Sequence, residues 1–194
     1  MQDDAPYTYA GANGKSVNNY DRRYRGFTTL REAITDSINI VTVKTLAQAG
    51  VSLGWQYVQE YGFTTVDSRD MNEALALGGI TQGVSNLELT AAYAAIANQG
   101  TYIRPKFYTK ILDHDGNVLI DNTTPESHTV IKDTTAWLLT SAMEDVMTSG
   151  TGTSAYFGSS MAQAGKIRYN DQQPRCFICR LHTLLYLCCL GWLR

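Results

Sequence analysis

Ser37-Ile38-Asn39 and Lys166 are the residues of this chain whose types could support proton transfer and the binding of a peptide. Ser37 and Asn39 lie between two predicted helices, where a loop can present a hydroxyl beside a carboxamide. A serine can relay a proton, and an asparagine can both donate to and accept from a peptide-like ligand. A structural explanation stays open. Ser37 could cap the helix that begins near Ile40, Asn39 could occupy a turn, and Lys166 could be a solvated surface lysine.

Other polar groups in the chain fit a site less well. The segment Gly150-Thr151-Gly152-Thr153 follows no predicted strand and precedes no G-K-[S/T], which excludes a phosphate-binding loop and indicates a mobile connection. His114 falls in a predicted hairpin turn and His128 in a polar loop. Neither histidine is therefore expected to act as a catalytic base.

The cysteines of the chain raise the question of a metal site. Cys176 and Cys179 have the spacing of zinc ligands, and His182 with Cys188 could complete the set. The adjacent Cys188 and Cys189, surrounded by leucines, fit a zinc knuckle poorly. We therefore expect no metal and no cofactor.

Composition divides the chain into two parts. With 44% apolar and 18% charged residues, the 194 residues suit a globular domain, and a net charge of −2 gives no indication of nucleic-acid binding. All four cysteines lie in the last 19 residues, and from Ile167 onward there are four arginines and one acidic residue. We therefore treat residues 1–166 as the domain and residues 167–194 as an aberrant tail.

Local signals predict the elements that would position the candidate residues. Residues 1–27 are rich in turn formers, and capping boxes at Thr29 and Ser85 each begin a helix, the first one short. Further helices are predicted from Ile40 to the stop at Gly50 and over residues 53–62, with a glycine-rich turn over 74–83. Runs with a period of two flank a hairpin turn at 114–117. A last helix, capped by Asp133, has its apolar side at Trp137, Leu138, Ala142, Met143, Val146 and Met147.

Neither end of the chain has the pattern of a membrane or export signal. The N-terminal residues 1–6 are acidic and lack an apolar stretch, so we expect either a cytosolic protein or a missing front. The tail over 176–193 contains Arg180 and His182, and a mid-helix arginine costs roughly 2.5–3.5 kcal/mol on insertion. A membrane-spanning helix is not expected there.

Three segments taken together resemble the transpeptidase domain of class A penicillin-binding proteins. They are TLREAITDSINIVTVK at 29–44, LALGGITQGVSNLELTAAYAAIANQGTYIRP at 75–105, and the stretch from AWLLTSAMEDVMTSGTG to AGK at 136–166. The resemblance implies an α/β (α+β) fold of the penicillin-binding and serine β-lactamase type, with an antiparallel sheet flanked by helices. Here that fold would be incomplete.

The resemblance also implies a role for each candidate residue. The family uses the motifs S-x-x-K, S-x-N and K-T-G. Ser37 and Asn39 match S-x-N, where the serine helps to shuttle the proton and the asparagine holds the substrate amide. Lys166 matches the lysine of K-T-G on an edge strand and is implied to support the electrostatics around the substrate carboxylate.

This sequence departs from the family pattern in two places. It contains no S-x-x-K, and the nucleophile is expected before the Asp4-Ala5-Pro6 region, outside the given residues. Ile167-Arg168 stands where Thr-Gly should follow Lys166. Permitted codons for residues 167–194, read one base later, can encode G-T-T and then D-x-x-F-x-G-Y-T-P. Because that is similar to the family continuation, the tail is interpreted as a frameshift product.

Two functions follow as expectations. In an intact parent, the domain would cross-link peptidoglycan stem peptides by serine acyl transfer and would be acylated by β-lactam antibiotics. It would lie at the extracytoplasmic face of the bacterial cell membrane, with membrane contact only through missing N-terminal parts. Alternatively, the chain as written is a non-catalytic fragment or pseudogene product without acylation activity.

Overall fold

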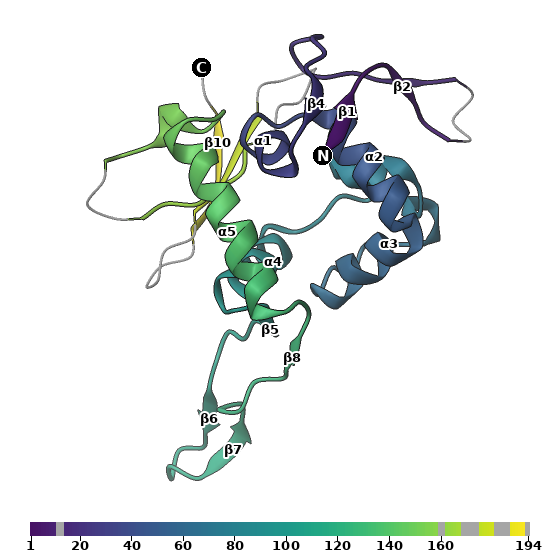
Figure 1. Cartoon of the computed structure of the whole chain (residues 1–194). Coiled ribbons are helices and arrows are strands. Elements are labelled where there is room, and N and C mark those ends of the chain that lie inside the picture. Colours follow the sequence, from purple (N-terminus) through teal and green to yellow (C-terminus); the bar gives the residue numbers. More distant parts are fainter. Residues whose placement is uncertain (11–13, 159–161, 168–174, 181–186, 193–194) are drawn as a thin grey trace.

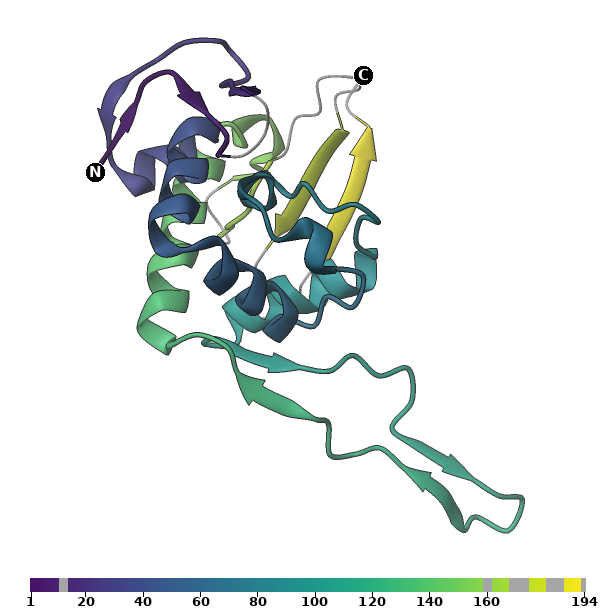
Figure 2. The same ribbon diagram turned by 90° about the vertical axis from the view of Figure 1, so that its right-hand side faces the viewer.

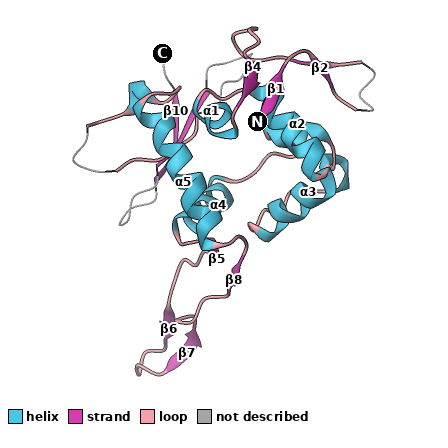
Figure 3. Cartoon of the chain, in the orientation of Figure 1, coloured by secondary structure: helices cyan, strands magenta, loops and turns pink. Residues whose placement is uncertain are grey.

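The computed structural model describes residues 1–10, 14–158, 162–167, 175–180 and 187–192. Helices form the body of the molecule, and a long two-stranded arm extends away from it (Figures 1 and 3). The strands of the described part form five separate antiparallel pairs instead of the single sheet that the fold class suggests. The mixture of helices and small antiparallel sheets agrees with an incomplete α/β fold.

The N-terminal region contains two short strand pairs where only turn-rich chain was predicted. β1 (Gln2–Asp4) pairs with β4 (Gly26–Thr28), and β2 (Tyr7–Thr8) pairs with β3 (Ser16–Val17). Strands of two or three residues leave almost no periodicity to detect in a sequence. The partners β1 and β4 also lie more than twenty residues apart, so only the folded structure shows their pairing.

The first three helices follow the predicted order. α1 (Leu30–Thr35) begins with the expected capping box between Thr29 and Glu32, and it is short. α2 (Asn39–Ala49) ends at Gly50, whose φ of 102° suits a glycine, and α3 (Val51–Glu60) starts directly after it. α3 therefore begins two residues earlier than the range 53–62 that the sequence suggested.

The middle of the chain contains two short 3-10 helices and one longer α-helix. η1 (Ser68–Asp70) and η2 (Glu73–Leu77) precede Gly78, which is left-handed and ends η2 inside the predicted glycine-rich turn. α4 (Asn86–Ala97) begins with the predicted capping box between Ser85 and Glu88. The alanines Ala91, Ala92 and Ala95 of α4 are buried, as close helix packing requires.

The arm is built from two strand pairs in series. β5 (Thr101–Ile103) pairs with β8 (Ser127–Thr129), and β6 (Lys110–Leu112) pairs with β7 (Val118–Asp121) beyond them. Figure 2 shows the β6–β7 pair far from the helices. The hairpin that the period-two runs predicted is therefore confirmed.

α5 (Asp133–Thr148) forms as predicted but differs in its cap and in its buried face. The N-cap is Lys132 without a side-chain hydrogen bond, and Asp133 is the first helical residue. Ala142, Met143, Val146 and Met147 are buried with Ala136, whereas Trp137 is 68% exposed and Leu138 57% exposed. The helix packs against α1 and α4, and the described chain leaves the part of its apolar surface at Trp137 and Leu138 uncovered. A short 3-10 helix, η3 (Thr153–Ala155), follows.

The tail contributes one antiparallel pair, β9 (Arg175–Arg180) with β10 (Leu187–Trp192). His182, which the zinc alternative requires, and the other residues after Ile167 that are not in these strands lie outside the described part. Within the described ranges, no helix is long and apolar enough to cross a membrane.

Candidate functional site

The Ser37 loop, defined as residues 36–39, is a tight connection between α1 and α2 and includes the first residue of α2. Asp36 ends α1, and the Ser37 amide donates to the Ile34 carbonyl at 3.3 Å. Ser37 has a φ of 57°, a left-handed conformation that side chains with a Cβ seldom adopt. Ile38 is 1% exposed and anchors the loop in the core. Strained residues of this kind persist where the surroundings over-determine them, and they cluster at functional sites.

The capping explanation for Ser37 is wrong. The N-cap of α2 is Ile38, which has no side chain able to accept a hydrogen bond, and Asn39 is already helical. The turn conformation expected for Asn39 therefore occurs at Ser37 instead. Both Ser37 and Asn39 are half-buried, so each side chain is partly accessible to solvent.

Asn39 is tied to a segment far from it in the sequence. Its Nδ2 donates to the Asn18 carbonyl at 2.8 Å. This bond fixes the carboxamide of the S-x-N tripeptide against the N-terminal region. The structure therefore brings Ser37 and Asn39 together on one loop. The burial of Ile38 and the bond from Asn39 to Asn18 both fix its position.

Lys166 lies in a segment that packs against Met143 of α5. The Gly165 amide donates to the Met143 carbonyl at 3.2 Å, and the Lys166 ammonium donates to the Ile167 carbonyl at 3.0 Å. Burial lowers the pKa of Lys166 to about 8, because the protonated amine is removed from water. In residues 162–167 only Ala164 forms a strand bridge, so the expected edge strand is not formed there.

One apolar cluster connects the Ser37 loop with the Lys166 segment. Met143 of α5 and Ala164 are buried against each other, and Ile34 of α1 packs against them. Ile34 precedes Ser37 by three residues and Ala164 precedes Lys166 by two. The fold thus places the two motifs around the same cluster, although the hydrogen bond of the Lys166 ammonium goes to its own segment and not to Ser37 or Asn39.

The segment Gly150-Thr151-Gly152 is packed, contrary to the mobile connection that the sequence suggested. The Thr151 amide donates to the Thr35 carbonyl at 3.2 Å, at the end of α1. A Cβ on Gly150 would collide with that same carbonyl, so glycine permits the close approach. This contact supports the α1 end of the Ser37 loop.

Two residues that sequence reasoning missed lie behind the loop. Asp4 and Asn19 are buried polar residues, and Asn19 Nδ2 donates to the two Asp4 carboxylate oxygens at 2.9 and 3.0 Å. Asn19 Oδ1 accepts from the Ile40 amide at 3.3 Å. The only sequence signal was an asparagine in turn-rich chain, which gives no indication of a long-range contact.

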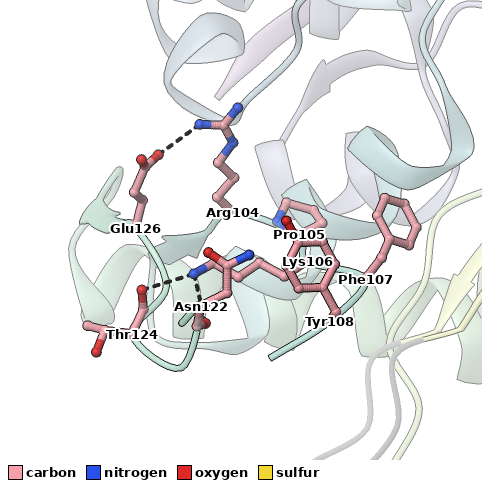
Figure 4. Close-up of a pocket in the computed structure, with 8 residues that line it drawn as sticks. All are labelled: Arg104, Pro105, Lys106, Phe107, Tyr108, Asn122, Thr124 and Glu126. Carbon is pink, nitrogen blue, oxygen red and sulfur yellow. Dashed lines mark hydrogen bonds and ion pairs between the residues drawn. The ribbon is translucent and has the colours of Figure 1, made fainter. Parts of the chain in front are cut away.

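A pocket of about 350 Å³ lies elsewhere, in the arm between its two strand pairs (Figure 4). The charged side chains that line it form ion pairs or hydrogen bonds with other lining residues. Arg104 pairs with Glu126 at 3.0 Å, and Lys106 Nζ donates to the carbonyls of Asn122 and Thr124. The pocket contains none of the three candidate site residues. Within the described residues, no group of three or more potential metal ligands was found.

Comparison with known sequences agrees with this architecture. The family model described as the penicillin binding protein transpeptidase domain matches residues 2–166. The chain is 39% identical over 152 residues to penicillin-binding protein 1F of Bacillus subtilis, covering 78% of this chain and 21% of that protein. It is 34% identical over 175 residues to penicillin-binding protein 1A of Clostridium acetobutylicum, covering 88% and 21%. The chain thus spans about a fifth of the length of these curated relatives.

Solved structures show the same fold at lower identity. Penicillin-binding protein 1A of Haemophilus influenzae superposes with a TM-score of 0.78 at 22% identity, covering 92% of this chain and 32% of the other. PonA1 of Mycobacterium tuberculosis gives a TM-score of 0.76 at 20% identity, covering 95% and 51%. The fold is therefore that of the penicillin-binding transpeptidase class, present in part. The chain belongs to the penicillin-binding protein transpeptidase domain family.

Proposed function

We propose that this chain forms part of a transpeptidase domain that, in its complete protein, cross-links peptidoglycan stem peptides. In that reaction an activated serine attacks the penultimate D-Ala carbonyl and D-alanine leaves. An amine of a neighbouring stem then accepts the acyl group. The observation that carries the proposal is the Ser37 loop, where a strained serine and a fixed asparagine lie within the segment that matches the family model.

Each candidate residue has a role in this proposal. The Ser37 hydroxyl relays a proton during acyl transfer, and the Asn39 carboxamide holds the substrate amide. Lys166 is assigned to the electrostatics around the substrate carboxylate. With a pKa of about 8, it is mostly protonated at neutral pH and thus able to attract an anion.

A second candidate function is a non-catalytic fragment. Two observations favour it for the chain as given. The 194 residues contain no S-x-x-K, and Ile167 is buried where the family pattern has a threonine hydroxyl. The site described here then supplies a partial binding surface without a nucleophile.

Acylation by a labelled penicillin tests both candidates. The 194-residue chain is expected to form no covalent adduct, and the product of the complete reading frame that contains it is expected to be acylated on the serine of an S-x-x-K. A serine-linked adduct on the 194-residue chain would exclude the fragment function. An unlabelled complete product would exclude the transpeptidase.

Variants of the complete product test whether the Ser37 hydroxyl takes part in acylation. Ser37→Ala is expected to slow acylation by about a hundredfold or more, because the proton relay is lost. Ser52→Ala, in α3, is the matched control because it removes the same hydroxyl away from the loop. Equal rates for both variants would remove Ser37 from the proposed mechanism.

The division of the chain at residue 166 is also a proposal. We attribute residues 167–194 to a frameshift, supported by the change in composition at that point and by the family-like sequence in the shifted frame. Sequencing the genomic DNA through codon 166 tests this. A shifted frame without G-T-T and the following D-x-x-F-x-G-Y-T-P would contradict it.

The partners follow from the proposed reaction. They are peptidoglycan stem peptides and, because penicillins imitate their D-Ala-D-Ala end, β-lactam antibiotics. One solved neighbour, PonA1, is described in complex with penicillin V. The extracytoplasmic face of the bacterial membrane is where such a substrate lies, and fractionation of cells that express the complete product would test that location.

A further inference from the structure

Asp4 and Asn19 form a buried polar pair beside the start of α2. Asp4 is fully buried, and its carboxylate accepts from Asn19 Nδ2 and from the Arg25 amide at 2.9 Å. Asn19 Nδ2 also donates to the Arg23 carbonyl at 2.7 Å. Buried polar groups are costly unless their hydrogen bonds are made, so this pair holds one fixed arrangement.

The pair supplies a cap that α2 lacks. The first amides of a helix have no partner within the helix, and a polar side chain at the N-cap normally satisfies one of them. Ile38 occupies the N-cap of α2 and has no side chain that can do so. Asn19 Oδ1 accepts from the Ile40 amide instead, from a position 21 residues earlier in the chain.

The same segment also holds the side chain of the S-x-N motif. The carbonyl of Asn18, next to Asn19, accepts from Asn39 Nδ2 at 2.8 Å. The segment Asn18-Asn19 therefore contacts α2 at two successive residues, Asn39 and Ile40. Figure 1 shows β1, which contains Asp4, beside α2.

We propose that Asp4 and Asn19 are positioning residues of the transpeptidase site, which fix the Ser37 loop through a hydrogen-bonded cap on α2. This inference rests on the proposed function. Ser37 is held at a φ of 57°, a conformation that relaxes unless both ends of the loop are fixed. Ile38 fixes the loop by burial, and Asn19 fixes the first turn of α2 by hydrogen bonding.

A charge-preserving exchange of the two side chains gives the sharpest test. In the double variant Asp4→Asn with Asn19→Asp, the amide at position 4 donates to the carboxylate at position 19. That carboxylate still accepts from the Ile40 amide, but one of the two bonds between the side chains and the bond to the Arg23 carbonyl are lost, and a carboxylate oxygen comes to face that carbonyl. In Asn19→Asp alone, two carboxylates face each other in a buried position, which disfavours the cap.

The first measurement is hydrogen exchange in the 194-residue chain. Asn19→Ala and Asn19→Asp are expected to speed exchange of the Ile40 amide by at least roughly tenfold, and the double exchange is expected to recover part of the protection that Asn19→Asp loses. The Gly165 amide, bonded to Met143, serves as an internal reference for global opening. Equal acceleration at Ile40 and Gly165 would show that the pair is merely part of the general core.

The second measurement is penicillin acylation of the complete product, at limiting and at saturating antibiotic. Asn19→Ala is expected to lower the saturating acylation rate by at least roughly tenfold, and the double exchange is expected to retain a higher rate than Asn19→Ala. The control is Asp70→Asn, which alters an equally buried carboxylate that holds Thr81 instead. An effect of Asp70→Asn as large as that of Asn19→Ala would overturn the positioning role.

The two measurements separate failure of this inference from failure of the proposed function. A complete product that is not acylated at all refutes the transpeptidase, and hydrogen exchange still decides whether Asn19 caps α2. A wild-type acylation rate in a folded Asn19→Ala variant refutes the positioning role while the transpeptidase stands.

Discussion

The Ser37 loop and the arm over residues 101–129 are both connections between helices, but different contacts hold them. The loop is fixed by bonds to remote segments, such as those from Asn39 to Asn18 and from Ile40 to Asn19. The outer arm is held by bonds within itself, and Phe107 is 86% exposed and Leu119 64% exposed. Long-range contacts can impose a strained backbone, whereas a two-stranded hairpin is by itself only marginally stable.

Removing the buried Ile38 side chain of the Ser37 loop is expected to have the largest effect on the free energy of unfolding. Ile38→Ala deletes a side chain that is 1% exposed, and the cavity should lower the free energy of unfolding by about 2–5 kcal/mol. The matched arm variant is Ile120→Ala, at a 43% exposed position in β7, with an expected loss below about 1 kcal/mol. Urea unfolding followed by circular dichroism measures both. Similar losses would contradict the distinction between the two regions.

Lys166→Met tests the burial of the lysine through the pH dependence of stability. The pKa of Lys166 is about 8 in the folded chain and near its ordinary 10.5 when unfolded. Between these values the unfolded chain holds the proton and the folded chain does not, so stability rises with pH there and is reduced below about pH 8. The variant should therefore be more stable at pH 7, by on the order of 2–3 kcal/mol, and should lack that rise.

Burial also raises the pKa of Tyr61 to about 12, and this opposes the lysine at high pH. Wild type and Lys166→Met are therefore compared by urea unfolding at each pH from 7 to about 9, below most tyrosine ionisation. Parallel stability curves for the two proteins would show that Lys166 is not desolvated in the folded chain.

Ser37→Gly separates stability from function in the loop. Glycine adopts a φ of 57° without strain, so the variant is expected to be more stable by about 0.5–1 kcal/mol. Gln99→Gly, at another left-handed position with a φ of 55°, should give a similar gain. In the complete product, only Ser37→Gly should lose penicillin acylation. Loss of acylation in both, or in neither, would contradict the assignment of the hydroxyl.

Removing surface ion pairs is expected to give the smallest difference in stability between the two regions. Arg31 joins α1 to α5 through Asp145 at 2.6 Å and through the Ser141 carbonyl at 3.1 Å. Arg31→Ala should lower stability by about 0.5–1 kcal/mol, with a smaller loss at high salt. Arg104→Ala removes the exposed pair with Glu126 on the arm, and we expect no measurable change in the thermal midpoint. A larger loss of stability in Arg104→Ala than in Arg31→Ala would contradict the distinction between the two regions.

Sequence reasoning succeeded where the stabilising contacts are local. The capping boxes at Thr29 and Ser85 join residues three apart, so their side chains are visible in a short window of sequence. The stop at Gly50 and the hairpin turn before Asn117 are equally local. The exposed face of α5 was missed because periodicity marks an apolar side without showing what covers it, as Trp137 illustrates.

The site shows the same limit. The S-x-N motif and the candidate lysine are found from the sequence through family resemblance, but the left-handed conformation of Ser37 has no signature in the tripeptide. The cap from Asn19 to Ile40 joins segments 21 residues apart, and the cluster around Met143 and Ala164 joins α1 to the end of the described domain.

The sequence by itself determined that the five α-helices of the described residues form, that capping boxes begin α1 and α4, and which residues match the family motifs, because these depend on side chains within a few positions of one another. The tertiary structure decided the conformation of Ser37, the cap on α2, the lowered pKa of Lys166 and the exposure of Trp137. Each of these depends on which remote segments exclude water from a residue or offer it a hydrogen bond. Those neighbours exist only after the chain has folded.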